Sequence, residues 1–233
     1  MLDLAGRKRV LAFYAHPDDE TLAAGATLAK LARAGAEVHV AIPATGAYAR
    51  RPGRQDSELA AELEQLHGDC KNAMGVLGIP PSNLHLGDFS DNEMDRHTRL
   101  ELIQWLERVI AEVRPEVVFT HHRYCTNVDH QYCHEAAVVA TRPALGSNIT
   151  LLSGEVPSST GYLRPAQWEP NLFIEVSAED VALKIKAMQT YRNEARPDPH
   201  PRSPQVLSAL AKLRGSEGGY YFAEAFMIQR TFA

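Results

Sequence analysis

The sequence predicts a Rossmann-like α/β fold, in which one doubly wound, mainly parallel sheet carries helices on both faces. Short apolar segments alternate with longer segments of helical periodicity along most of the chain. The segments VLAFYA and VVFT are nearly continuous apolar runs, as is typical of strands buried on both faces. A length of 233 residues accommodates one large domain or two small ones, and a single domain over 1–233 is the simpler interpretation.

The first elements form a βαβ unit. Val10 to Ala15 is the first predicted strand, and Thr21 to Ala34 is a helix with one apolar face. Gly35 ends this helix, and Glu37 to Ile42 is the next strand. Two strands that are joined through a helix run parallel, with a right-handed crossover.

The same alternation continues towards the C-terminus. We expect helices over 57–77, with Ser57 as N-cap, and over 98–113, 130–141 and 178–191, and strands over 84–86, 117–120 and 172–176. Residues 50–55, 154–169 and 196–204 are predicted loops. In such sheets ligands bind at the carboxyl ends of the strands, near the point where strand order reverses. Polar clusters follow Ala15 and Thr120, so these two strand ends are the candidate site.

Composition and charge exclude several functions. The formal net charge of −5 argues against a nucleic-acid surface, which needs clustered Lys and Arg. The N-terminus lacks a signal-peptide core, and no apolar run has membrane-spanning length. The three cysteines are too few and too scattered for a disulfide framework. We therefore expect a cytoplasmic protein whose partners are a small molecule or further copies of itself, as a homo-oligomer.

The first polar cluster is AHPDDE, residues 15–20. One imidazole and three carboxylates directly after a buried strand are unfavourable unless a cation compensates their charge. Histidine and aspartate are zinc ligands, and a catalytic zinc site takes three protein ligands and leaves one position open. Capping of the following helix by Asp18 or Asp19 is the structural alternative, but it explains one carboxylate and not three plus a histidine.

The second cluster spans 120–134, THHRYCTNVDHQYCH. His130 and His134 are spaced i, i+4 at the start of a helix, so either is a candidate third ligand. Asp129 suits the orientation of a ligand histidine. His121 and His122 end a strand and face opposite sides, so at most one of them points at the site. A thiolate zinc site at Cys125 and Cys133 is a weaker alternative, because no CxxC spacing is present.

The run AHPDDE, with NVDH at 127–130, resembles the PIG-L/LmbE-like zinc deacetylases, which remove acetyl groups from N-acetylglucosaminyl conjugates. The resemblance covers most of the chain, including RSPQVLSALAKLRGSEGGYYFAEAF near the C-terminus. It implies that His16, Asp19 and His130 bind zinc. It also implies that Asp18 is the general base that takes a proton from the attacking water, and it leaves His134 as a helix residue near the site.

The sequence departs from the family at one position. Many members have histidine where this chain has Asn127, and that histidine is assigned to stabilising the oxyanion. An amide still donates a hydrogen bond to an oxyanion but carries no positive charge. Proton donation to the leaving nitrogen would then fall on Asp18, unless His122 or His200 supplies the missing imidazole.

Further candidates for substrate binding are Arg50 and Arg51, in a loop after the second strand, where the alternative is a solvated basic loop. His200 lies in the stretch His200-Pro201-Arg202-Ser203, which would form a lid over the site or a subunit contact. Fe²⁺ or Co²⁺ would also suit a site of two histidines and one aspartate.

Three rival functions remain. A zinc amidase acting on a non-sugar amide, such as a thiol conjugate, would use the same residues. A dinucleotide-binding oxidoreductase is disfavoured, because no G-x-G-x-x-G follows the first strand. A structural metal in a non-enzymatic, sugar-binding protein is disfavoured too, because such sites are usually closed by four ligands and rich in cysteine.

Overall fold

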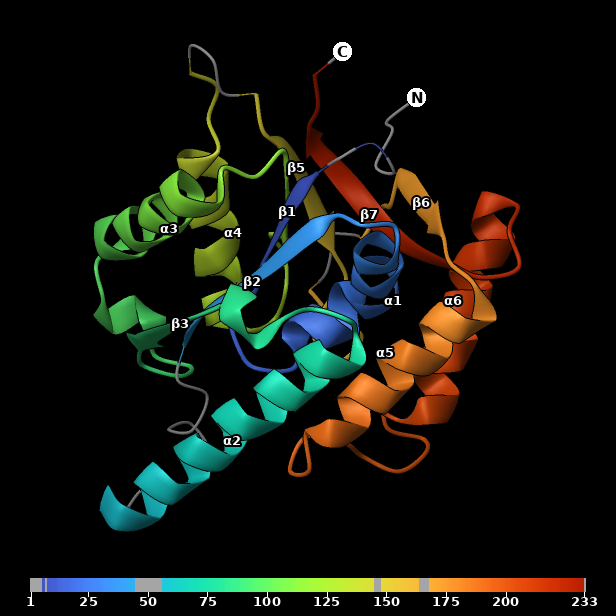
Figure 1. Cartoon of the computed structure of the whole chain (residues 1–233), viewed down its shortest axis with the longest axis horizontal. Helices are drawn as coiled ribbons and strands as arrows, with labels where there is room; N and C mark the ends of the chain where they lie inside the picture. The colour runs from blue at the N-terminus through green and yellow to red at the C-terminus, as the bar shows by residue number, and fades with distance from the viewer. Residues whose placement is uncertain (1–5, 7, 45–55, 145–147, 164–167, 233) are drawn as a thin grey trace.

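The computed structural model describes residues 6, 8–44, 56–144, 148–163 and 168–232, and the side chains of 56–60 lie outside this description. It has one mixed, mostly parallel sheet between two layers of helices (Figure 1). The strands are β1 (Arg9–Phe13), β2 (Glu37–Ala44), β3 (Leu84–Phe89), β4 (Val117–His121), β5 (Thr150–Gly154), β6 (Leu172–Glu175) and β7 (Ala223–Arg230). The helices are α1 (Asp19–Arg33), α2 (Asp56–Val76), α3 (Arg99–Val113), α4 (Val128–Ala140), α5 (Ala178–Thr190) and α6 (Pro204–Gly218), with short 3-10 turns at Pro81–Asn83 and Met94–Arg96.

The predicted fold class is confirmed. The strand order is β3-β2-β1-β4-β5-β7-β6, with β1 to β5 parallel and β7 antiparallel to both of its neighbours. The chain moves from β1 outward through β2 to β3, and then returns to the other side of β1 as β4. Strand order therefore reverses between β1 and β4, which are the two strands that the polar clusters follow.

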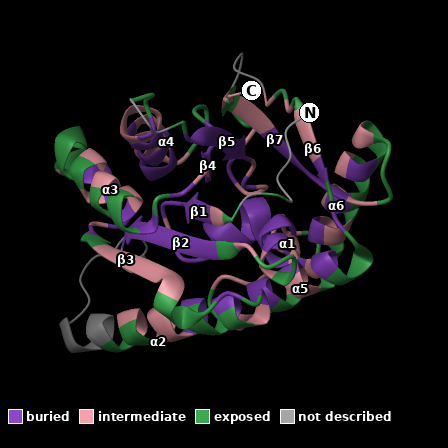
Figure 2. Ribbon diagram, turned by 45° about the horizontal axis from the view of Figure 1, so that its top comes forward, coloured by how far each residue is buried: buried purple, intermediate pink, exposed green. Residues whose placement is uncertain are grey.

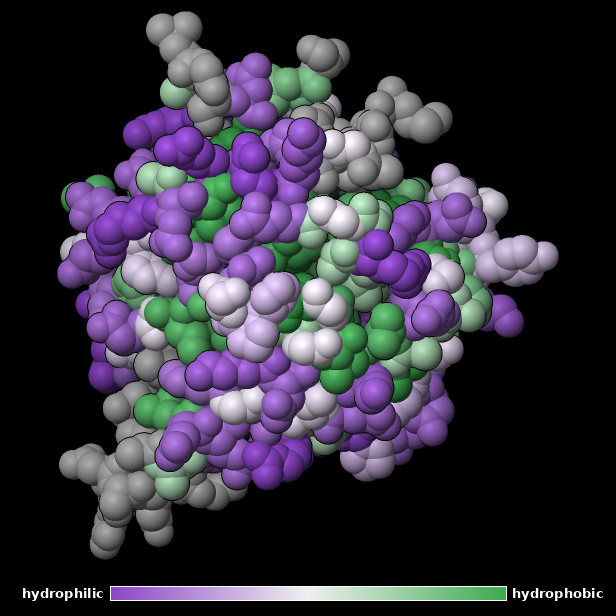
Figure 3. Space-filling view, viewed as in Figure 1, coloured by the Kyte–Doolittle hydropathy of each residue, from purple (hydrophilic) through white to green (hydrophobic). Residues whose placement is uncertain are grey.

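The core lies on both faces of the sheet, and Figure 2 shows the central strands buried between half-exposed helices, with β3 and β6 less buried. Alternate residues of β1 point to opposite faces, so that Val10 and Ala12 pack in the core with α1 and α2, while Leu11 and Phe13 pack with α3 and α4. On the outside, Figure 3 shows hydrophilic residues spread over one face, with hydrophobic residues in small groups between them. Among the described residues no helix has the length and apolarity to cross a membrane.

Several predicted boundaries differ from the structure. The helix predicted from His130 begins at Val128, because Asn127 caps it through a hydrogen bond from Asp129 N–H. Ser57 is not an N-cap, since α2 already includes Asp56. Two strands and one helix were not predicted: β5, whose last residue Gly154 was placed in a loop, α6, which begins at Pro204, and β7.

Candidate metal centre and cavity

The two polar clusters meet at the carboxyl ends of β1 and β4, on the wall of a cavity of about 1090 Å³. The cavity is lined by the loop after β1, the loop after β3, the start of α4 and the segment 192–202. Most of its described lining residues are polar, and the apolar ones among them are Pro17, Leu66 and Val128.

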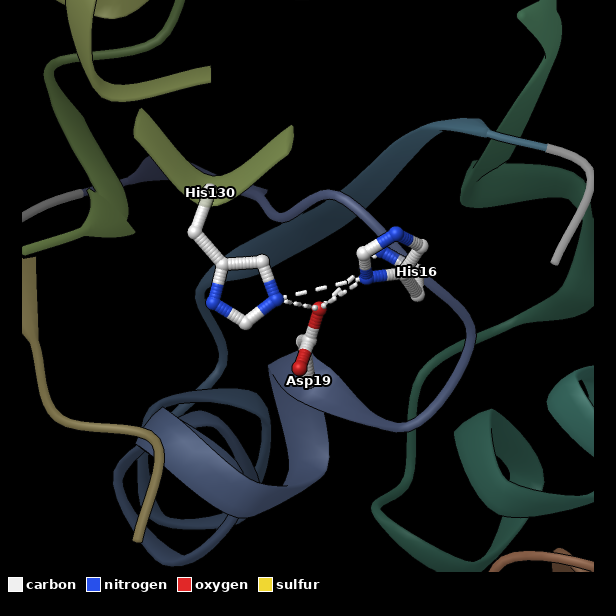
Figure 4. A group of neighbouring side chains, drawn as sticks. All are labelled: His16, Asp19 and His130. Atoms are coloured by element: carbon white, nitrogen blue, oxygen red, sulfur yellow. Dashed lines mark hydrogen bonds and ion pairs between the residues drawn. The ribbon is translucent and has the colours of Figure 1, made fainter. Parts of the chain in front are cut away.

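His16, Asp19 and His130 point their ligand atoms at one another in the wall of this cavity (Figure 4). Asp19 Oδ2 lies 3.0 Å from His16 Nδ1 and 3.1 Å from His130 Nε2, and the two nitrogens are 3.3 Å apart. Zinc bonds of about 2.0–2.2 Å at tetrahedral angles separate ligand atoms by about 3.3 Å or slightly more. The three donors therefore fit a divalent cation that keeps a further position free for a ligand from the cavity.

The three carboxylates of AHPDDE lie in different environments because of the turn between β1 and α1. Asp19 is the first residue of α1, and its Oδ2 accepts a hydrogen bond from His16 N–H. Asp18 has the left-handed φ of 116° and makes no side-chain cap bond, so capping does not account for its carboxylate. Glu20 points into the core, where it accepts hydrogen bonds from Asp18 N–H and Tyr191 O–H.

A second group of possible ligands, His16, Asp91 and Asp129, uses the other nitrogen of His16. His16 Nε2 lies 2.9 Å from Asp129 Oδ2 and 3.2 Å from Asp91 Oδ1. Asp129 is fully buried and also accepts hydrogen bonds from Asn92 N–H and Met94 N–H. Because Nδ1 faces Asp19 and His130, these carboxylates hold the far side of the ring, as carboxylates commonly do for a ligand histidine.

Asp18 faces the cavity beside this cluster and forms an ion pair with Arg202, in which Arg202 Nη1 lies 2.7 Å from Asp18 Oδ2. The same guanidinium nitrogen also contacts Glu194. Burial raises the pKa of Asp18 well above its usual value, and the charge of Arg202 opposes that rise. A carboxyl group with a raised pKa is suited to exchange protons near neutral pH.

The cluster behaves as a set of ion pairs when no cation is bound. Burial alone would lower the pKa of His130, but Asp19 raises it to about 9. Burial likewise opposes the charge of His16, while hydrogen bonds to Asp129 and Asp19 raise the pKa of His16 well above its usual value. Burial would raise the pKa of Asp19, but His130 and His16 hold it well below the usual value.

Asn127 lines the cavity at the start of α4. Its Oδ1 accepts the hydrogen bond that caps the helix, and its Nδ2 donates to Asn92 Oδ1 at 2.6 Å. The amide nitrogen has two hydrogens, and this bond uses one of them. Its role towards an oxyanion stays a prediction.

The remaining predicted site residues are spread more widely. His200 lines the cavity, whereas His122 and His134 are absent from its described lining. His122 packs its ring 5.1 Å from that of Trp168, and His134 Nδ1 lies 2.9 Å from the carbonyl oxygen of His121. Arg50 and Arg51 lie outside the described residues.

The structure brings Arg202, Asp91 and His121 to the site; sequence analysis assigned no role to Asp91, and for the other two it left the position open. Arg202 precedes Ser203 and Pro204. A serine N-cap followed by proline is typical of a helix start, and this signal could have predicted α6. Asp91 follows β3 at the same edge of the sheet, where the strand-end rule could have found it. His121 stacks on His130 with ring centroids 3.8 Å apart, and its Nε2 accepts a hydrogen bond from Ala15 N–H.

Comparison with known proteins places the chain in a family. The model of the PIG-L family, described as GlcNAc-PI de-N-acetylase, matches residues 11–141, which is more than half of the chain. The chain therefore belongs to the PIG-L family, and the predicted family resemblance is confirmed.

Named relatives of the chain include deacetylases. An uncharacterized deacetylase of Escherichia coli, YaiS, is 29% identical over 80% of this chain and 92% of its own length. The diacetylchitobiose deacetylase of Thermococcus kodakarensis is 26% identical over 93% of this chain and 81% of its own length.

Solved structures with the same fold carry more than one activity in their names. The N,N'-diacetylchitobiose deacetylase of Pyrococcus horikoshii has a TM-score of 0.75 at 21% identity, over 96% of this chain and 84% of its own. The 4-carboxy-2-hydroxymuconate hydratase GalB of Pseudomonas putida has a TM-score of 0.73 at 19% identity, over 97% and 98% of the two chains. The fold alone therefore does not decide the reaction.

Proposed function

We propose that this chain is a metal-dependent N-deacetylase that hydrolyses an N-acetylated amino sugar to acetate and a free amine. The observation that carries the proposal is the convergence of His16 Nδ1, Asp19 Oδ2 and His130 Nε2 beside the carboxyl group of Asp18 in one polar cavity. Two imidazoles and one carboxylate are a donor set typical of catalytic zinc, which we propose as the metal, with Fe²⁺ or Co²⁺ as substitutes.

The proposed chemistry needs a nucleophile and a place for negative charge. A divalent cation held by the three donors would lower the pKa of water and polarise the acetyl carbonyl. Asp18 accepts the proton of the attacking water, and its raised pKa suits the later return of that proton to the leaving nitrogen. Asn127, which lines the cavity, is the proposed donor of a hydrogen bond to the developing oxyanion.

The residues around this centre have supporting roles in the proposal. Asp129 orients His16, and Arg202 holds Asp18 in its position at the cavity. The polar lining suits the hydroxyl groups of a sugar, and two relatives are named as deacetylases, one of them acting on diacetylchitobiose. His200, in the lining, is a candidate for contact with the substrate.

The test is acetate release from a panel of N-acetylglucosamine derivatives by zinc-loaded and chelated protein. We expect zinc-dependent release, and we expect Asp18→Asn to lower turnover by a factor of about 100 to 10,000 while metal still binds. Metal binding without release from any N-acetyl sugar would contradict the sugar substrate and favour a non-sugar amide. Failure to bind a divalent metal would contradict the proposed mechanism as a whole.

A further inference from the structure

His16, Asp19 and His130 form the proposed metal triad. Its two histidines differ in the partner of the ring nitrogen that faces away from the metal position. His16 Nε2 faces the carboxylates of Asp129 and Asp91. His130 Nδ1 instead faces a sulfur atom, Cys125 Sγ, at 3.2 Å, with Ser159 Oγ at 3.4 Å. Ligand histidines are usually oriented by a carboxylate, a backbone carbonyl or water, so a thiol in this position is a feature of this chain that needs a physical account.

The geometry of the triad determines which nitrogen of His130 carries the proton when a cation is bound. Nε2 faces Asp19 Oδ2 and His16 Nδ1, so it is the atom that must offer its lone pair. A neutral imidazole then has its hydrogen on Nδ1, which becomes a donor. The acceptor nearest to it is Cys125 Sγ, and the larger radius of sulfur makes 3.2 Å a close contact.

The sulfur is held firmly in this position. The Cys125 side chain is fully buried, and its Sγ lies 3.2 Å from Ser159 Oγ and 3.1 Å from Thr160 Oγ1. Gln131 Nε2–H, from α4, donates to the Cys125 carbonyl oxygen at 2.7 Å. Cys125 is therefore fixed both to the loop after β5 and to the helix that carries His130.

We propose that Cys125 is a positioning residue of the metal centre, whose Sγ accepts the hydrogen bond from His130 Nδ1–H and fixes the orientation of that ligand. This inference rests on the proposed function, because it requires His130 to bind a cation. The sulfur does not coordinate the cation itself, since it lies on the opposite side of the ring from Nε2.

Zinc affinity, measured by competition with a chromophoric chelator, tests the inference in the full-length protein. We expect Cys125→Ala to bind zinc about 10- to 100-fold more weakly than wild type. This is the range typical of a ligand histidine that loses the hydrogen-bond partner of its other ring nitrogen. Cys125→Ser keeps an acceptor and should recover part of the affinity. Cys133→Ala is the matched control, because Cys133 is equally buried and its Sγ contacts Met94 Sδ rather than a ligand; we expect it to keep wild-type affinity.

The outcomes separate this inference from the proposed function. Tight zinc binding by wild type, with an equal affinity in Cys125→Ala, would overturn the role of Cys125 and leave the metal centre standing. A wild-type protein that binds no zinc would overturn both. Two measurements on wild type do not depend on the folding of a variant. Nitrogen-15 NMR should show His130 protonated at Nδ1 in the zinc form, and a sulfur-to-metal charge-transfer band in the cobalt form would overturn the inference by showing a thiolate ligand.

Discussion

At the scale of single residues, the candidate metal centre holds at least one proton that a bound cation would displace. The pKa of His130 is raised to about 9 by Asp19, against the effect of burial, so its imidazole is charged at neutral pH. A cation needs the lone pair of Nε2, and its binding must therefore release at least one proton. We expect zinc affinity to rise about tenfold or more per pH unit between about pH 6 and 8.

Calorimetric titration with zinc in two buffers of different ionisation enthalpy counts the released protons. A release of one or more protons per zinc at pH 7 agrees with the charged imidazole. A count of zero would show that the histidines of the free protein are already neutral.

Arg202 controls the charge of Asp18 through their 2.7 Å ion pair. Its positive charge lowers the pKa of Asp18, which burial raises, so Arg202→Gln should raise that pKa further. A general base works only when ionised, and the acidic limb of the pH–rate profile should therefore move to higher pH. We expect kcat/KM at pH 7 to fall by up to about 100-fold and to recover partly in alkaline buffer.

The profile of kcat/KM against pH for three variants checks this prediction. Arg202→Lys keeps the charge and should shift the limb less. Arg196→Gln is the control from the same segment, because the Arg196 guanidinium donates to backbone carbonyl oxygens of Asn193 and Ala195 instead of to Asp18. An unmoved limb in Arg202→Gln would mean that the ion pair does not set the ionisation of Asp18.

At the scale of elements, Asp180 joins α5 to α1, the helix that begins with Asp19. Its carboxylate completes the capping box of α5 by accepting from Ser177 N–H and Oγ–H, and it forms an ion pair with Arg33 in the last turn of α1. Asp180→Ala removes these hydrogen bonds and the ion pair, while the Ser177 hydroxyl can still cap α5, and should lower the free energy of unfolding by about 2–3 kcal/mol at pH 7.

The effect of this substitution should depend on pH. Burial would raise the pKa of Asp180, but Arg33 and Ser177 hold it below its usual value. The stabilisation is thus complete above the unfolded pKa of about 3.9 and is lost as pH falls through the folded pKa. Urea unfolding at pH 7 and pH 3 should show a difference between wild type and Asp180→Ala that shrinks in acid. The exposed neighbour gives the control, Glu179→Ala, with an expected change within about 0.5 kcal/mol.

The elements that the sequence predicted well are those with strong local signals. β1 and β4 consist mostly of apolar residues, and α3 begins with the capping box of Thr98 and Glu101. β7 was missed because it contains Glu224, a charged residue that is buried among tertiary partners: Lys184 of α5 pairs with it at 2.6 Å, and two backbone N–H groups of α1 donate to it. Lys184 and Glu224 are 40 residues apart in the sequence, so no local pattern predicts that they pair.

At the scale of the whole molecule, only those residues of the candidate site that directly follow a strand could be predicted from the sequence. His16, Asp19 and His130 follow β1 and β4, which any doubly wound sheet brings together. Arg202 comes from a proline-rich segment whose position depends on the packing of α6 against β7. Its contact with Asp18 is tertiary, and no spacing in the sequence predicts it.

The whole molecule also determines what metal removal should do. Cores on both faces of the sheet stabilise the fold, and the ligands keep protein partners without a cation, such as Asp129 for His16 and His16 N–H for Asp19. Chelation should therefore abolish turnover and leave the far-UV circular dichroism unchanged at 25 °C. Zinc at about 100 times its Kd adds about 2.7 kcal/mol, which for a domain of this size raises Tm by about 5–10 °C. The shift should persist in Asp18→Asn and vanish in His130→Ala, whereas unfolding on chelation would show that the metal is structural.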